Sequence, residues 1–249
     1  MRKRSRSSLY LLVLVLVLSM VAAAGCNTQK SEPNSAAKTP VVEKEKVYTR
    51  AETVASAEDA IKLLEEGNQR YVSGQVMKQD LGSEKRGLLA AKGQKPFAVV
   101  LTCSDSRVPA EYIFDQGLGD IFVVRVAGNV VDPVALGSIE YGVEHLKTPL
   151  LVVLGHEKCG AVKATVDGGE APGSIGAIVE KIKPSADKAK AAGAKGDALY
   201  EKAADENILA TIAEIEKSPV VEELVKEGHL KIVGAKYHLT SGEVTFNKE

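Results

Sequence analysis

The distribution of apolar and polar residues along the chain indicates a domain in which strands and helices alternate. Short and nearly continuous apolar runs, typical of strands covered on both faces, occupy 97–102, 120–126 and 150–154. A further strand is expected at 229–235 and a short edge strand at 243–246. Because helical segments separate these runs, the pattern predicts an α/β fold with a mainly parallel sheet flanked by α-helices.

Helical periodicity accounts for most of the remaining chain. The first two helices form an N-terminal arm, and a long Ala-, Lys- and Glu-rich region forms an α-helical C-terminal subregion. Within that region, 186–195 is expected to be a solvated helix face or an exposed loop. The segments with helical periodicity are 56–73, 83–91, 133–146, 161–166 and much of 174–228.

The first 25 residues have the features of an export signal. A basic start is followed by the apolar run 9–18 and the small residues 22–25, and Cys26 comes directly afterwards. Small residues before a Cys resemble the lipobox of bacterial lipoproteins, in which that Cys is lipidated and becomes the mature N-terminus. We therefore predict a lipoprotein signal peptide over 1–25 and an exported protein, anchored through Cys26 to the extracytoplasmic face of a bacterial membrane.

Two other interpretations of the N-terminus are an ordinary cleaved signal peptide and an uncleaved anchor, although the apolar run is short for a membrane span. Residues 26–54 are mostly polar and are expected to form a flexible tether, which leaves 55–249 as the folded domain.

The net charge of the whole chain is −1, and no basic cluster interrupts the domain. This charge pattern argues against a nucleic-acid partner.

Candidate chemistry lies at the ends of two of the predicted buried strands. Cys103 follows one strand, and His156 and Cys159 follow another. Two thiolates and one imidazole are ligands that suit a tetrahedral Zn²⁺, and the ends of parallel strands are where open α/β sheets hold their sites. In an exported protein the two Cys could instead form a disulfide, but a disulfide explains neither His156 nor the charged pair beside Cys103.

That charged pair consists of Asp105 and Arg107. Two residues after Cys103, Asp105 is close enough to reach a metal, and Arg107 lies on the same side of an extended segment. Held by Arg107, Asp105 would leave the metal open to water; released, it would close the site as a fourth ligand. The spacing therefore predicts a catalytic role for Asp105 and Arg107, and also makes Asp105 a candidate ligand.

These residues belong to motifs that resemble the β-class carbonic anhydrases. The matching segments are CSDSRVP at 103–109, FVVRVAGN at 122–129, GHEKCG at 155–160 and GNQRY at 67–71. The resemblance implies reversible hydration of CO₂ to bicarbonate, with one Zn²⁺ per chain held by Cys103, His156 and Cys159. It also implies that Asp105 and Arg107 free and orient the zinc-bound water.

The same resemblance implies a substrate pocket and an assembly. The residues that it assigns to binding of CO₂ or bicarbonate are Gln94, Phe122, Ala127, Tyr141 and Gly160. Subunits of the family usually pair, so the resemblance also implies a homodimer or a higher homo-oligomer. Two alternatives compete with this interpretation: a relative that hydrolyses CO₂-like molecules such as CS₂, and a lipoprotein that binds metal or solute without catalysis.

Overall fold

The structure is a computed structural model that describes residues 47–50 and 53–247. The predicted signal peptide, Cys26 and most of the predicted tether lie outside the described residues. The helices are α1 (Ala57–Val72), α2 (Ser83–Lys92), α3 (Ala110–Ile113), α4 (Pro133–Glu140), α5 (Gly160–Asp167), α6 (Ile175–Ala191), α7 (Asp197–Ile215) and α8 (Pro219–Lys226). Two short segments, the 3₁₀ turn η2 (Ala127–Asn129) and the π-helical turn η3 (Tyr141–His145), accompany them.

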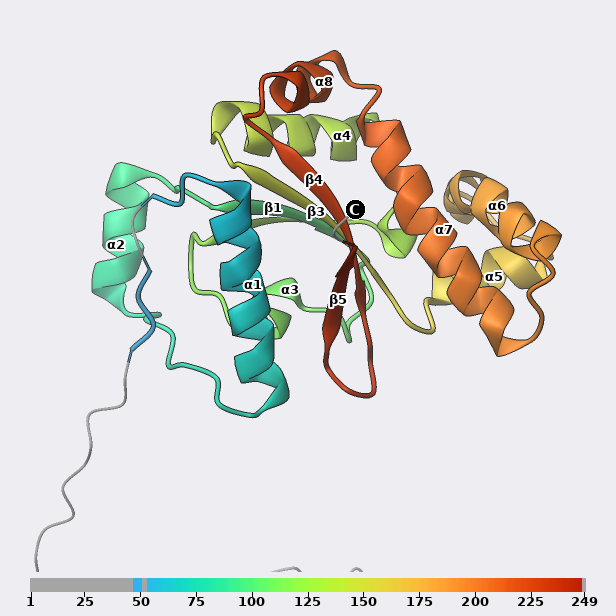
Figure 1. Ribbon diagram of the computed structural model, residues 1–249, viewed down its shortest axis with the longest axis horizontal. Helices are drawn as coiled ribbons and strands as arrows, with labels where there is room; N and C mark the ends of the chain where they lie inside the picture. The colour runs from blue at the N-terminus through green and yellow to red at the C-terminus, as the bar shows by residue number, and fades with distance from the viewer. Residues whose placement is uncertain (1–46, 51–52, 248–249) are drawn as a thin grey trace, which may run out of the picture. The chain divides into compact units, whose positions relative to one another are not determined.

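One five-stranded sheet runs through the centre of the domain (Figure 1). Its strand order is β2-β1-β3-β4-β5; the first four are parallel, and β5 runs antiparallel to β4. The predicted mainly parallel α/β fold is therefore confirmed. The strands are β1 (Ala98–Thr102), β2 (Ile121–Arg125), β3 (Leu150–His156), β4 (Lys231–Tyr237) and β5 (Val244–Asn247).

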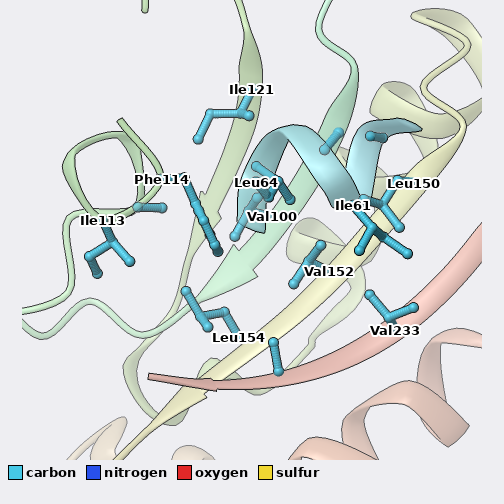
Figure 2. Close-up of a cluster of buried hydrophobic side chains, with 14 of the residues drawn as sticks. Ile61, Leu64, Val100, Ile113, Phe114, Ile121, Leu150, Val152, Leu154 and Val233 are labelled. Atoms are coloured by element: carbon cyan, nitrogen blue, oxygen red, sulfur yellow. The ribbon is translucent and has the colours of Figure 1, made fainter. Parts of the chain in front are cut away.

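Helices cover both faces of the sheet, which explains the uninterrupted apolar runs of the central strands. Successive side chains of a strand point to opposite faces, and every residue of β1 and β3 is buried. Val100 and Val152 face α1 and α3, in the cluster that Figure 2 shows. Val99 and Val153 face the opposite layer, which α4, η3, α7 and α8 form. A polar residue at any of these positions would lie inside a core.

A separate helical cluster forms where α5, α6 and α7 pack together, and it corrects one expectation. Residues 186–195 were expected to be a solvated face or an exposed loop, but α6 continues through most of them, and Ala186 and Ala189 are buried. Their partners on α7, Ala203 and Ala204, are buried in the same cluster. Most of 186–195 is exposed, as expected, and the expectation fails only at these two positions, where small Ala side chains let the helices pack together while the neighbouring Lys residues remain at the surface.

Residues 47–50, which composition placed in the tether, are attached to the domain. The Val47 backbone pairs with Lys78, and the Tyr48 hydroxyl donates a hydrogen bond of 2.8 Å to Gln116. Arg50 Nε lies 2.6 Å from Asp120. The folded domain thus extends at least to Val47, before the expected boundary at residue 55. In the described part of the chain, no helix is both long and apolar enough to span a bilayer.

The GNQRY segment, residues 67–71 of α1, packs closely against the chain that follows α3. Gly67 lies on α1, and a Cβ atom there would come within 1.8 Å of the Phe114 carbonyl oxygen. One helical turn later, Arg70 Nε lies 2.6 Å from the Asp115 carboxylate, whose side chain is 3% exposed. The absence of a side chain at Gly67 permits the close contact, and the ion pair between Arg70 and Asp115 then stabilises it.

Asn68 uses its whole side-chain amide in the same contact. Its Nδ2 donates hydrogen bonds to the carbonyls of Ile113, at 3.1 Å, and Gly242, at 2.8 Å. Its Oδ1 accepts a hydrogen bond of 2.9 Å from the Val244 amide. Asn68 therefore ties α1 both to the end of α3 and to the β4–β5 hairpin.

We expect Gly67→Ala to lower the free energy of unfolding by about 2 kcal/mol or more, because its methyl group must displace backbone rather than a flexible side chain. Thermal and urea unfolding measure the loss. Gly87→Ala on α2 is the matched control, since a Cβ there meets nothing within 4 Å. This control should gain about 0.5–1 kcal/mol of helix stability. An equal change in the free energy of unfolding in the two variants would contradict the close approach between Gly67 and the Phe114 carbonyl.

Candidate metal centre

The parallel register of β1 and β3 brings the predicted metal ligands to one edge of the sheet. Thr102 pairs with Leu154, so Cys103, which follows β1, lies beside the end of β3, whose last residue is His156. The chain continues from β1 to β2 on one side of β1 and then returns to β3 on the other. In open α/β sheets, such a reversal leaves a crevice at the carboxyl ends of the strands, where ligands bind.

The side chains of Cys103, His156 and Cys159 meet in this crevice. Their ligand atoms all lie within 4.8 Å of one another, and the three residues are only 5%, 0% and 4% exposed. Both thiols are free, so the disulfide alternative does not describe this structure. The three predicted ligands, which come from two chain segments, are thus brought together as a single buried group.

The imidazole of His156 is oriented by the backbone of its own turn. The carbonyl of Glu157 accepts a hydrogen bond of 2.8 Å from His156 Nδ1. The other ring nitrogen, Nε2, is therefore the one available to a metal beside Cys103 and Cys159. The Glu157 carboxylate in turn accepts hydrogen bonds from His238 Nδ1, at 2.8 Å, and from the Leu239 amide, at 3.1 Å. The hydrogen bond from His238 holds the pKa of Glu157 below its usual range. The β4–β5 hairpin therefore supports the orientation of the ligand ring.

The other nitrogen of this ring tests whether the site fits a metal. His156 Nε2 is fully buried and has no hydrogen-bond partner among the described residues. A buried polar atom without a partner costs about 1–3 kcal/mol, so such atoms are rare unless something else binds them. Two sulfur atoms and one imidazole nitrogen form the donor set that Zn²⁺ prefers. The residues present therefore fit a zinc ion.

The two thiols differ in their surroundings. Cys103 Sγ accepts a hydrogen bond of 3.2 Å from the Gly128 amide. The pKa of Cys103 is lowered, first because the Cys159 thiol donates a hydrogen bond to it and then because the Gly128 amide does the same. Sharing the proton with this thiolate raises the pKa of Cys159. The crevice thus favours at least one thiolate, the form that binds a metal.

Asp105 and Arg107 form the predicted pair at the open side of the ligands. Arg107 Nε and Nη2 donate to the two carboxylate oxygens at 2.9 and 2.7 Å, and the Arg107 amide donates to Oδ1 at 2.9 Å. The Arg107 guanidinium lowers the pKa of Asp105 to about 2. Asp105 Oδ2 lies 4.0 Å from His156 Nε2. The carboxylate is therefore ionised, bound by Arg107 and adjacent to the ligand atoms.

Arg125 and Gly128 support the site, although our prediction gave neither of them this role. Arg125 ends β2, and its guanidinium donates to the Cys103 carbonyl at 3.1 Å and to the Asp105 carbonyl at 2.6 Å. Gly128 has a φ of 72°, and a Cβ there would lie 2.6 Å from Ile182 Cδ1. The signal available in the sequence was the charged Arg125 at the end of an apolar run; only the strand register, in which Thr102 pairs with Arg125, places it beside Cys103.

Comparison with known proteins agrees with this geometry. A family model described as carbonic anhydrase matches residues 98–244. The carbonic anhydrase of Mycolicibacterium smegmatis is 46% identical over 190 residues, which are 74% of this chain and 90% of that protein. The chain belongs to the β-class carbonic anhydrases.

Solved β-class structures share the fold. The β-carbonic anhydrase CcaA superposes with a TM-score of 0.59 at 27% identity, over 76% of this chain and 87% of its own. A tetrameric β-carbonic anhydrase from the ascomycete Sordaria macrospora, at 24% identity, has a TM-score of 0.62 and shows the fold alone. The alignment with that protein covers 77% of this chain and 98% of the fungal one.

Within this β-class chain, two of the predicted pocket residues lie beside the ligands. Ala127 precedes Gly128, whose amide contacts Cys103 Sγ. Gly160 begins α5 directly after Cys159, and a Cβ there would meet nothing within 4 Å. Both positions therefore adjoin the metal ligands along the chain, and their roles in substrate binding remain predictions.

The other three pocket residues lie elsewhere in the same chain. Gln94 precedes β1, whereas Cys103 follows it, so a five-residue strand of about 17 Å separates them. Phe122 pairs with Val99, about 13 Å before Cys103 along β1. The ring of Tyr141 lies 6.1 Å from that of Phe122. Gln94, Phe122 and Tyr141 thus lie away from the metal ligands of their own chain, and their binding role remains a prediction.

Proposed function

We propose that this β-class chain hydrates CO₂ reversibly to bicarbonate and a proton, using one Zn²⁺ held by Cys103, His156 and Cys159. The observation that carries the proposal is His156 Nε2, which is buried without a partner and faces two free thiols beside an ionised Asp105. When bound, Zn²⁺ supplies a water molecule of lowered pKa, and so a nucleophile at neutral pH.

In this proposal, Asp105 is a hydrogen-bond acceptor for the reacting water. Its Oδ2 lies near the ligand nitrogen of His156 but is bound by Arg107, so the carboxylate has an oxygen at the crevice without taking a place among the ligands. Arg107 thus holds Asp105 in the position that leaves room for the reactants. Storage of a metal does not require such a pair, which favours catalysis over the alternative of a binding lipoprotein.

We also propose a homodimer or higher oligomer, in which Gln94, Phe122 and Tyr141 of a second copy complete the substrate pocket. What supports this is their distance from the crevice of their own chain, together with exposed apolar side chains around them. Tyr141 is 47% exposed and Val134, on the neighbouring α4, is 79% exposed. CO₂ is small and apolar, so aromatic walls supplied across an interface would suit it.

Export and lipid anchoring through Cys26 form the last part of the proposal, and their support is the sequence of residues 1–26. Val47 is the first described residue and already contacts the domain, so at most residues 27–46 would separate the lipid from the enzyme. On this proposal, bicarbonate chemistry takes place outside the cytoplasm.

We expect the zinc-loaded protein to accelerate CO₂ hydration at about pH 8.5 in a stopped-flow indicator assay, where the nucleophile is deprotonated. Asp105→Asn should lose turnover, because its amide cannot accept the same hydrogen bonds, yet retain about one zinc ion per chain by elemental analysis. The control is Asp187→Asn, which removes an exposed carboxylate paired with Lys183 on α6. This control should keep the parental rate.

No zinc-dependent rate above that of the buffer would overturn the proposed activity. Loss of zinc from Asp105→Asn would instead identify Asp105 as a required ligand and contradict the position we assign to it.

For localisation, we expect Cys26→Ser to move the protein from the membrane fraction to the soluble fraction of an expressing bacterium, because lipidation requires the thiol. Immunoblots of the separated fractions measure the shift. Membrane association that persists in this variant after a salt wash would count against the lipid anchor.

A further inference from the structure

The turn between the two ligands His156 and Cys159 contains a residue in an unfavourable backbone conformation. Lys158 has a φ of 51°, in the left-handed region that favours glycine. Such a residue persists where its surroundings hold it in place, and these positions cluster at functional sites. The contacts of Lys158 therefore show what this turn depends on.

Both backbone polar groups of Lys158 are bound by charged side chains. Its amide donates a hydrogen bond of 3.0 Å to Glu201 Oε1, from α7. Its carbonyl accepts a hydrogen bond of 3.3 Å from Arg107 Nη2, the same nitrogen that binds Asp105 Oδ2 at 2.7 Å. One residue thus links a carboxylate on α7 to the guanidinium that holds Asp105.

Glu201 is itself oriented by a lysine of the sheet. Lys236, on β4, has a side chain that is only 14% exposed, and its Nζ lies 2.8 Å from Glu201 Oε2. The same Nζ lies 2.8 Å from Asp205 Oδ1, one helical turn along α7. Asp205 and Glu201 therefore share a cation, but of these two described carboxylates only Glu201 has a hydrogen bond to the turn.

We propose that Glu201, oriented by Lys236, is a positioning residue for the Asp105–Arg107 pair. By binding the Lys158 amide it stabilises the left-handed turn, and the turn then presents the carbonyl that holds the Arg107 guanidinium against Asp105. The inference rests on the proposed function for its catalytic consequence, but the placement of Arg107 is a separate property of the folded chain. Outer contacts of this kind commonly affect activity by about 10–100-fold.

The test compares three variants of the zinc-loaded protein. Glu201→Ala removes the acceptor and should lower kcat/KM at least about tenfold. Glu201→Gln keeps an oxygen that can accept from the Lys158 amide, but its Nε2 cannot bind the Lys236 ammonium, so this variant should retain more kcat/KM than Glu201→Ala and less than the parent. Asp205→Asn is the matched control, because it removes the other carboxylate from Lys236 without touching the turn, and it should keep the parental kcat/KM.

A second readout does not depend on activity. In ¹H–¹⁵N spectra, the Arg107 Nε–H signal reports its hydrogen bond with Asp105; it should shift toward the free-guanidinium position in Glu201→Ala, shift less in Glu201→Gln and stay in place in Asp205→Asn. Thermal unfolding and zinc content establish that each variant is folded and loaded.

The outcomes separate this inference from the proposed function. An inactive parent protein would overturn the proposed activity. The Arg107 Nε–H signal would still show whether Glu201 positions Arg107 against Asp105. Parental kcat/KM and an unshifted Arg107 signal in Glu201→Ala would overturn the positioning role. So would equal losses in Glu201→Ala and Asp205→Asn, because these would show that only the charge around Lys236 matters. A Gln variant as impaired as the Ala variant would contradict the hydrogen bond to Lys158.

Discussion

The parallel pairing of β1 with β3 is the constraint on which the site depends. Because Thr102 lies opposite Leu154, Cys103 and His156 leave the sheet side by side, although 53 positions separate them in the sequence. A shift of one residue in this register would turn the buried side chains of either strand to the opposite face. The two apolar layers that cover the sheet oppose such a shift, so the packing of the core also places the ligands.

Around the ligands, several charged side chains bind backbone groups. Arg125 holds the carbonyls of the segment that carries Cys103 and Asp105, and Glu157 is anchored to the β4–β5 hairpin. Lys158 is held on one side by α7 and on the other by Arg107. These contacts explain how a short turn with a left-handed residue can present two ligands in fixed positions.

Sequence patterns predicted those features that depend on local composition. Fully buried strands leave continuous apolar runs, and the spacing of Cys103, His156 and Cys159 indicated the metal ligands. Composition could not show which face of α6 another helix covers, so the burial of Ala186 and Ala189 was missed. Glu201 lies in a charged helix, and only the tertiary structure places it beside Lys158. The location of Gln94 at the far end of β1 likewise follows from the direction of the strands.

We propose that two thiolates and one imidazole hold the metal while Asp105 stays bound to Arg107. Zinc-edge X-ray absorption of the loaded protein measures this donor set directly. We expect two sulfur neighbours at about 2.3 Å, with the remaining nitrogen and oxygen neighbours at about 2.0–2.2 Å. Cys159→Ser should leave one sulfur neighbour. A parent spectrum without sulfur neighbours, or one with four, would rule out this ligand set.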